Sequence, residues 1–122
     1  MARIRDLMGT GNSAGSAKAI AGTAGSITAA GTTQGAATLL SYETNVVTSA
    51  GGADAVVLPT AAQGSQAGDT CYVQAISSTT VQVFPGGSDT ANASTSAISC
   101  AQNKMVIAKR LTNTTWGYII TA

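Results

Sequence analysis

Histidine is absent from this 122-residue chain, and charged side chains of either sign are scarce. Histidine is the commonest general base and a frequent metal ligand, so its absence removes most Ser–His and Cys–His nucleophile designs. Only 9% of the residues are charged and the net charge is +1, which provides no concentrated basic surface for nucleic acid or an anionic membrane. The sequence therefore predicts neither nucleic acid nor membrane as a partner.

The carboxylates show no reaction-centre pattern, because no two of the five are close in sequence: Asp6, Glu43, Asp54, Asp69 and Asp89. A paired-carboxylate glycosidase site could assemble only by folding. A calcium site built from the last three lacks the required ligand spacing. The favoured interpretation is that the aspartates form turns by bonding to their own backbone. We predict a protein that is not an enzyme, with no catalytic residue, no metal and no cofactor.

Large side chains and long apolar runs are also scarce. Aromatic residues make up 4% of the chain, and much of the 44% hydrophobic content is alanine, which buries little area. A small domain with so thin a core has marginal stability as a monomer, so we expect burial of apolar surface to be shared between copies.

No run reaches the roughly 20 apolar residues of a membrane span, and no apolar run of signal-peptide length follows Arg3 and Arg5. We therefore expect synthesis in the cytoplasm without export.

Two regions of the chain differ in composition. Residues 1–37 are rich in Gly, Ala, Ser and Thr, and contain an imperfect repeat in which the Ala-Gly-Ser of residues 14–16 occurs again at 24–26. Such a segment buries little apolar area, so we interpret residues 1–37 as an N-terminal arm that is held by a neighbouring subunit. A short helix near residues 13–21 is the one helix expected, capped by Asn12 or Ser13. Residues 38–122 form the second region, a β-rich domain.

In the second region, short β-branched runs alternate with Gly, Pro, Asn and Asp clusters, a pattern typical of all-β proteins. Cys71, Val73 and Ala75 share one face of an alternating run. The last two runs suggest a hairpin around residues 112–114. Strands are expected at 38–48, 55–58, 70–76, 80–84, 97–100, 104–111 and 116–121. The predicted fold class is all-β: a small antiparallel sandwich or barrel preceded by a Gly/Ala-rich extended N-terminal arm.

Two residue sets leave alternatives open. Cys71 and Cys100 lie on separate expected strands, so a disulfide is geometrically possible, although two small buried apolar residues is the favoured reading in an unexported protein. Lys104, Lys109 and Arg110 are half of the basic residues and lie on one expected strand. They indicate a solvated strand edge that discourages unwanted pairing, with contact to an acidic neighbour or nucleic acid as the alternative.

Short motifs spread over most of the chain carry a family resemblance. They are the opening residues 1–6 and 9–14, the stretch 28–34, Val56-Val57-Leu58-Pro59, Gly68-Asp69-Thr70-Cys71-Tyr72-Val73, Val81-Gln82-Val83-Phe84-Pro85 and Trp116-Gly117-Tyr118. Together they resemble small virion proteins of tailed bacteriophages, of the head decoration, cement or head-fibre type.

The resemblance implies a structural role on the outer surface of the phage head. It implies an oligomer, typically a homotrimer, that stabilises the shell and is anchored on the major capsid protein through the N-terminal arm. The candidate contacts with the capsid or neighbouring subunits are Arg3, Ile4, Arg5, Leu7, Ile20 and Ile27. The main alternative is a tail-fibre or receptor-binding tip whose loops 62–69 and 88–95 touch a host glycan, although neither loop has an aromatic residue for sugar stacking. A small lysin-like enzyme or a secreted adhesin fits the composition less well.

Overall fold

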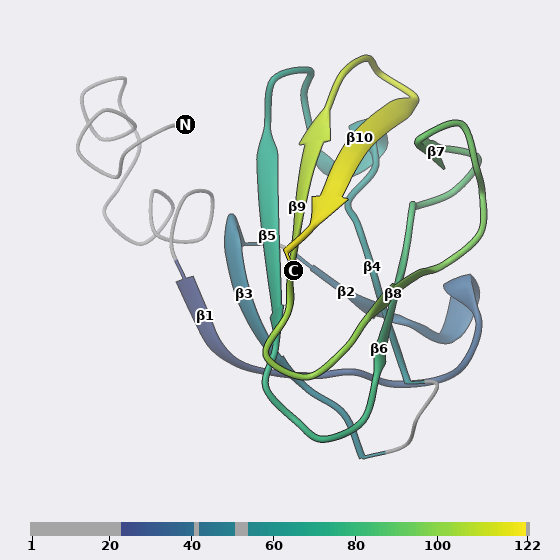
Figure 1. Cartoon of the computed structure of the whole chain (residues 1–122). Coiled ribbons are helices and arrows are strands. Elements are labelled where there is room, and N and C mark those ends of the chain that lie inside the picture. Colours follow the sequence, from purple (N-terminus) through teal and green to yellow (C-terminus); the bar gives the residue numbers. More distant parts are fainter. Residues whose placement is uncertain (1–22, 41, 51–53, 122) are drawn as a thin grey trace.

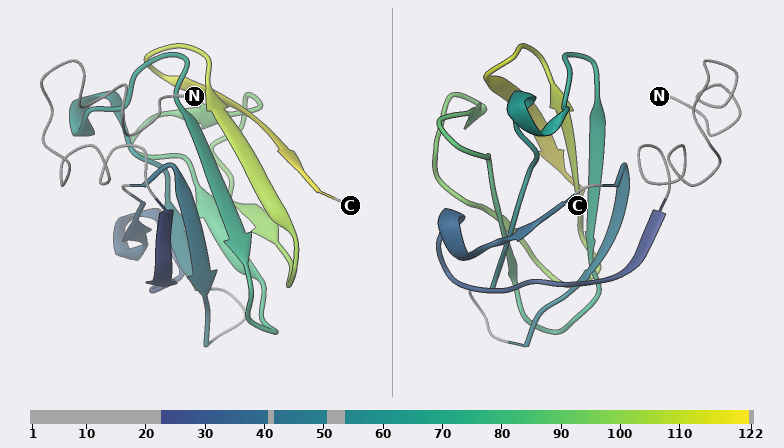
Figure 2. Two further views of the ribbon diagram at one scale, coloured as in Figure 1. Left: turned by 90° about the vertical axis from the view of Figure 1, so that its left-hand side faces the viewer. Right: turned by 180° about the vertical axis from the view of Figure 1, so that it is seen from behind.

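Two β-sheets form the molecule in a computed structural model that describes residues 23–40, 42–50 and 54–121. Figures 1 and 2 show the sheets as two layers facing each other. The strands are β1 (Thr23–Thr28), β2 (Thr38–Leu39), β3 (Thr44–Thr48), β4 (Ala55–Val57), β5 (Thr70–Ala75), β6 (Val81–Phe84), β7 (Thr90–Ala91), β8 (Ile98–Cys100), β9 (Met105–Arg110) and β10 (Thr115–Ile120), with 3-10 turns η1 (Gln34–Ala36) and η2 (Ala61–Gln63). No helix in the described ranges has the length and apolarity needed to cross a membrane.

The chain alternates between the two sheets as it proceeds. Sheet A has six strands in the order β1-β3-β5-β9-β10-β7, and sheet B has four in the order β2-β4-β6-β8. Successive strands within a sheet run parallel, from β1 through β3 to β5 and from β2 through β4 to β6. The first six strands therefore make a two-layer coil in which each crossover is a strand of the opposite sheet.

This coil corrects the expectation of an antiparallel sandwich, although the all-β class is confirmed. Among the described residues, the antiparallel strand pairs are β5 with β9, β6 with β8 and β9 with β10, beside two isolated antiparallel bridges. The Gly, Pro and Asn clusters in the sequence do mark turns. They do not reveal whether the chain returns beside the strand it has just left or crosses to the other layer, and that choice decides between antiparallel and parallel pairing.

The run 38–48, expected as one strand, is two strands in different sheets. β2 pairs with β4 in sheet B, and β3 pairs with β1 and β5 in sheet A. Leu40 lies between them and is buried, with its backbone N–H bonded to the carbonyl of Val57. β1 and η1 come from residues 23–37, so this part of the segment interpreted as an arm belongs to the two-sheet fold. The helix expected at 13–21 lies outside the described residues.

The C-terminal hairpin is confirmed. β9 and β10 are antiparallel neighbours, with Trp116 opposite Arg110 and Ile120 opposite Val106. β9 lies between β5 and β10, so it is an interior strand of sheet A. This corrects the expectation that the basic residues of this strand occupy a sheet edge.

Small apolar side chains from both sheets fill the space between the layers. The predicted alternation of β5 is confirmed, because Cys71, Val73 and Ala75 are buried while Tyr72 and Gln74 are half-buried. Each buried valine contributes about 1.5–3 kcal/mol relative to an exposed one. The core consists of Ala29, Leu40, Val47, Val56, Leu58, Cys71, Val73, Ala75, Val81, Val83, Ala91, Ile98, Cys100, Val106, Ala108 and Trp116. Trp116 is its one aromatic member.

Candidate functional site

Arg110 is the most heavily bonded side chain among the described residues, and it is buried at the end of β9. Its inward position follows from strand alternation, because Val106, Ala108 and Arg110 point to the same side of β9. Its side chain leaves 1% of the residue surface exposed. A charge buried this deeply is costly unless it is paired and hydrogen-bonded. The surroundings of Arg110 provide both.

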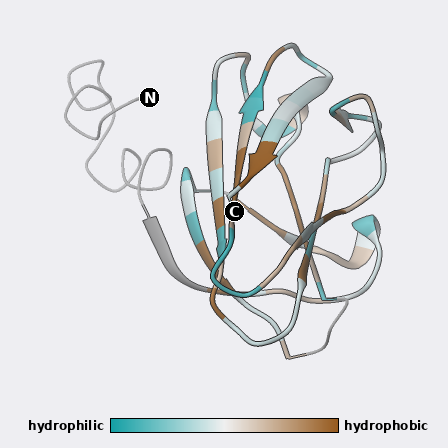
Figure 3. Cartoon of the chain, in the orientation of Figure 1, coloured by the Kyte–Doolittle hydropathy of each residue, from teal (hydrophilic) through white to brown (hydrophobic). Residues whose placement is uncertain are grey.

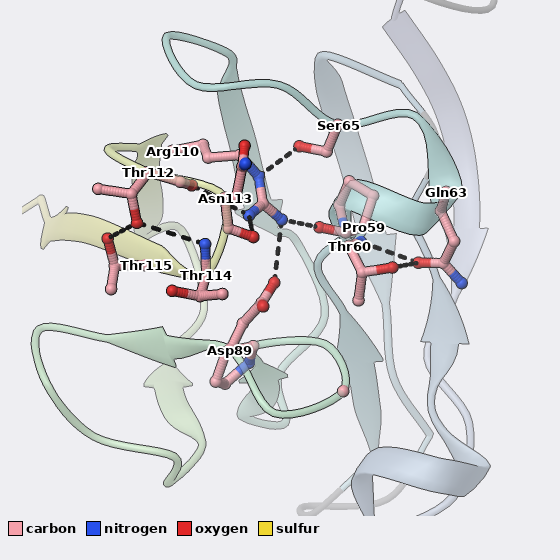
Figure 4. A network of polar contacts seen from close by, with 12 residues as sticks. Pro59, Thr60, Gln63, Ser65, Asp89, Arg110, Thr112, Asn113, Thr114 and Thr115 are labelled. Atoms are coloured by element: carbon pink, nitrogen blue, oxygen red, sulfur yellow. Dashed lines mark hydrogen bonds and ion pairs between the residues drawn. The ribbon is translucent and has the colours of Figure 1, made fainter.

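Every N–H donor of the Arg110 guanidinium has an acceptor (Figure 4). Nε donates to Ser65 Oγ at 2.7 Å, and Nη2 donates to the Pro59 carbonyl at 2.6 Å and to Asp89 Oδ2 at 3.0 Å. Nη1 donates to the carbonyls of Thr112 and Asn113 at 3.3 and 2.9 Å. These five bonds match the five donors of an arginine side chain. No donor is left for a ligand, so the group acts as a structural clamp.

The clamp joins three loops at one end of the two sheets. Pro59 and Ser65 flank η2, Asp89 precedes β7, and Thr112 and Asn113 form the β9–β10 turn. The turn of η2 is itself held by the Thr60 N–H, which donates to Gln63 Oε1 at 2.9 Å. The loops 62–69 and 88–95, which the sequence raised as possible glycan contacts, are therefore fixed at the same end of the molecule.

The aromatic ring of Trp116 completes the surroundings of Arg110. The guanidinium carbon of Arg110 lies 4.7 Å from the centre of the Trp116 ring, within the range of a cation–π contact. The Trp116 Nε1 atom is buried without a hydrogen-bond partner in the described part of the chain. Burial and stacking therefore hold the indole in place.

The aspartates act in turns and in the clamp. Asp69 Oδ2 accepts a bond from the Gln66 N–H at 2.8 Å, and Asp54 Oδ2 accepts one from the Ala50 N–H at 3.3 Å, as turn-forming residues do. Asp89 differs, because its carboxylate pairs with Arg110 and is almost fully buried. The described residues contain no cluster of three or more metal-ligating acidic or sulfur side chains.

The carboxyl group of Glu43 has a shifted pKa. Burial raises the pKa of Glu43, and the nearby negative charge of Asp69 raises it further. Glu43 Oε1 and Asn45 Oδ1 are buried acceptors without partners in the described ranges. Acid–base catalysis by two carboxyls needs both side chains free to act, and Asp69 is engaged in its own turn. The pair does not form a recognisable catalytic centre.

The two cysteines are buried and free, so their interpretation as small core residues is confirmed and they do not form a disulfide with each other. Burial raises the pKa of the Cys71 thiol to about 12, although Asn45 Nδ2 donates to its sulfur at 3.4 Å. Burial also raises the pKa of Cys100. Because the thiolate is the nucleophilic form, both side chains are unreactive at neutral pH.

The outer face of sheet A is the most unusual surface among the described residues, because apolar side chains follow one another across its strands. Cross-strand register aligns Ile119 of β10 with Ile107 of β9, Tyr72 of β5 and Thr44 of β3. A second row aligns Met105, Gln74 and Val46. We define the outer face as Thr44, Val46, Tyr72, Gln74, Met105, Ile107, Lys109, Gly117 and Ile119, together with Leu111.

Exposure on this face is highest on the β9–β10 hairpin. Ile119 is 63% exposed and Leu111 is 58% exposed. Figure 3 shows the apolar end of β10 and the alternating bands of β5. Leu111 reaches over Gly117, where an added Cβ would lie 3.3 Å from Leu111 Cδ1. Lys109 is the one charged residue of the outer face, and it lies at the end of β9 nearest the clamp.

The chain matches no protein-family model, no curated protein sequence and no solved structure. The geometry of the molecule therefore supplies the structural argument for function.

The candidate contacts chosen from the sequence are only partly placed. Arg3, Ile4, Arg5, Leu7 and Ile20 lie outside the described residues. Ile27 is on β1, where it is half-buried and packs against the core. The basic trio is separated: Lys109 is exposed, Lys104 is half-buried and Arg110 is fully buried. Alternation along 104–111 already placed Arg110 on the side of Val106 and Ala108, and this was the available signal for the clamp.

Proposed function

We propose that this chain is a structural subunit of a tailed-bacteriophage particle, which decorates and stabilises the outer surface of the head as an oligomer. The supporting observation is the contrast between its polar and apolar groups. The charged group with the most hydrogen bonds lies inside the fold, while Ile119 and Leu111 are exposed on sheet A beside the half-buried Ile107 and Tyr72. Exposed apolar patches of this kind mark surfaces that contact other proteins.

The proposed mechanism is stabilisation by mass action. A subunit that binds the assembled shell and not its dissociated components shifts the equilibrium toward the shell. Many symmetric copies add avidity, so each contact can be weak. The partners are the major capsid protein and further copies of this chain. The family resemblance implies that these copies form a homotrimer. The candidate anchoring residues are Arg3, Ile4, Arg5 and Leu7 of the N-terminal segment.

The test uses particles of the phage that encodes the chain, prepared with and without its gene. Heads lacking the protein should open at a lower temperature, and adding the purified full chain should restore their stability. The double variant Arg3→Glu/Arg5→Glu should bind these heads at least tenfold more weakly, while the single charge reversal Lys104→Glu in the β-domain should leave binding unchanged. Heads that bind none of the added chain, or that open at the same temperature with and without it, would refute the proposal.

A receptor-binding tip is the second candidate, because the Arg110 clamp fixes the loops 62–69 and 88–95 at one end of the molecule. Two loops held side by side could present a glycan-binding surface. In that case a host-glycan array should show binding that Gln66→Ala or Ser88→Ala reduces, because both residues are exposed in these loops. Particle reconstructions would then place the chain at the tail and not on the head.

A further inference from the structure

We propose that the outer face of sheet A is a two-fold contact surface, on which a second copy of this chain packs the same face. The inference deepens the proposed oligomeric role and rests on it. It assigns a two-fold contact, whereas the family resemblance implies a trimer. A three-fold contact would have to use other surfaces, so the two contacts can be tested separately.

The composition of the outer face supports a second copy as the occupant. Ile107, Ile119 and Tyr72 lie in one cross-strand row, with Met105 and Val46 in the next. The polar members are Thr44, Gln74 and Lys109, and no carboxylate is on the face. Contacts between identical subunits are more apolar than other interfaces, and the centre of an interface is depleted of charge. A nearly neutral face thus favours contact with its own copy over an acidic or basic partner.

The position of Lys109 supports a two-fold arrangement with opposed strands. A two-fold axis that lies in the plane of the contact, passes over Ile107 and runs across the strands reverses the strand direction of the second copy. Lys109 is two residues from Ile107, so the two Lys109 positions would be separated by about 13 Å along the strands. This exceeds the screening length of about 8 Å at physiological salt. Each lysine would lie over the row of Met105 and Gln74 in the other copy, where Gln74 Oε1 can accept one of its N–H bonds.

The size of the face predicts a weak contact. The row through Ile119, Ile107, Tyr72 and Thr44 crosses four strands. With strand spacings of about 4.8 Å and six residues of about 3.3 Å each, the face measures about 19 by 20 Å. Two such faces bury about 800 Å², which is the size of a weak contact and below that of a stable interface. The pair should therefore form reversibly at micromolar or higher concentration, and avidity would strengthen it on a particle.

Sedimentation of the full chain between about 1 µM and 1 mM tests the contact. The expected result is a monomer that converts to a dimer as concentration rises. Ile119→Lys places a charge on the face, and the 63% exposure of Ile119 makes a folding defect small. This variant should weaken dimerisation at least tenfold. The control is Leu39→Lys, at a residue 43% exposed on sheet B, which should leave dimerisation unchanged.

Cross-linking adds a readout that depends on position. Packed sheets lie about 10 Å apart, too far for a direct disulfide between opposed central residues but within reach of a short bis-maleimide. Ile107→Cys should give a cross-linked dimer, while Ser99→Cys, exposed on sheet B, should not. The native cysteines should stay unmodified because both are buried.

Three outcomes would overturn the contact: monomers at every concentration, association unaffected by Ile119→Lys, or equal cross-linking at positions 107 and 99. Each of them is measured on the isolated chain. Binding to phage heads is a separate measurement, so failure of this contact and failure of the proposed function are distinguishable.

Discussion

The Arg110 clamp and the outer face of sheet A both depart from the usual distribution of side chains, in which charged groups are exposed and apolar groups are buried. The clamp buries a positive charge at the end of β9, and the outer face exposes isoleucine and leucine on the same hairpin. In the clamp, all five N–H donors find acceptors within the chain. On the outer face, Ile119 and Leu111 remain more than half exposed.

The difference separates interactions that the chain completes alone from those that it leaves incomplete. Buried ion pairs are weak contributors to net stability, but losing one partner is costly because the other is left buried and unpaired. Exposed apolar side chains contribute little to the folding of a monomer. The clamp should therefore govern whether the chain folds, and the outer face should govern what the folded chain contacts.

The largest effect on folding is expected from Arg110→Met. This change removes the guanidinium, leaves Asp89 buried without its partner and frees three loops from their common anchor. The expected loss is about 3–5 kcal/mol of unfolding free energy, measured by urea denaturation. Lys109→Met, one residue earlier and exposed, should change stability by no more than about 0.5 kcal/mol. Equal losses for the two variants would show that burial of Arg110 does not matter.

A smaller loss is expected from Asp89→Asn. The asparagine keeps a side-chain oxygen that can accept the bond from Arg110 Nη2 but removes the negative charge. We expect a loss of about 1–3 kcal/mol, below that of Arg110→Met. The double variant Arg110→Met/Asp89→Leu should be more stable than Arg110→Met alone, because neither charge is then buried. Strict additivity of the two sites in thermal unfolding would contradict a coupled pair.

Alkaline pH should expose the contribution of Cys71. Its pKa is about 12 in the folded chain against an ordinary 9.0, so the folded state holds the thiol proton more tightly than the unfolded state. The contribution is fully present below pH 9 and is lost as pH rises toward 12, by up to about 1.4 kcal/mol per pH unit. In urea titrations from pH 8 to 11, Cys71→Ala should reduce this decline. An unchanged slope would show that Cys71 does not contribute to it.

The smallest effect on folding is expected on the outer face. Ile119→Thr should change the unfolding free energy by no more than about 0.5 kcal/mol at concentrations where the chain is monomeric. Val73→Ala, inside the same sheet, should cost about 1.5–3 kcal/mol because Val73 is completely buried. If both changes destabilise equally, Ile119 is part of the folding core, and the distinction between the two regions fails.

Local patterns in the sequence predicted the hairpin and most strands after residue 54, because alternation is a property of each segment. They missed β1, in the segment interpreted as an arm, and β7, inside the expected loop 88–95. The face of β5 with Cys71, Val73 and Ala75 and the pairing of β9 with β10 are confirmed. Pairing between distant segments was not predictable in the same way. The segment 40–43, which separates β2 in one sheet from β3 in the other, contains no Gly or Pro. The run 38–48 therefore looked like one continuous strand.

The clamp was missed because its two charges are 21 residues apart and each had a local explanation. Asp89 stands beside Gly-Gly-Ser and suggested a turn, and Arg110 follows Lys109 and suggested a solvated edge. Alternation placed Arg110 inward, but a buried arginine becomes credible only when its acceptors are known. Three of these acceptors are backbone carbonyls, which leave no mark in a sequence.

The interior position of β9 has a consequence for biosynthesis. β9 and β10 follow the other strands in the chain, yet β9 must enter sheet A beside β5, and β7 has β10 as its neighbour. Until β9 has left the ribosome, the edge of β5 that β9 will cover stays open, and such edges invite pairing between nascent chains. A chain that terminates early, before residue 105, would lack this cover and should be recovered as insoluble material.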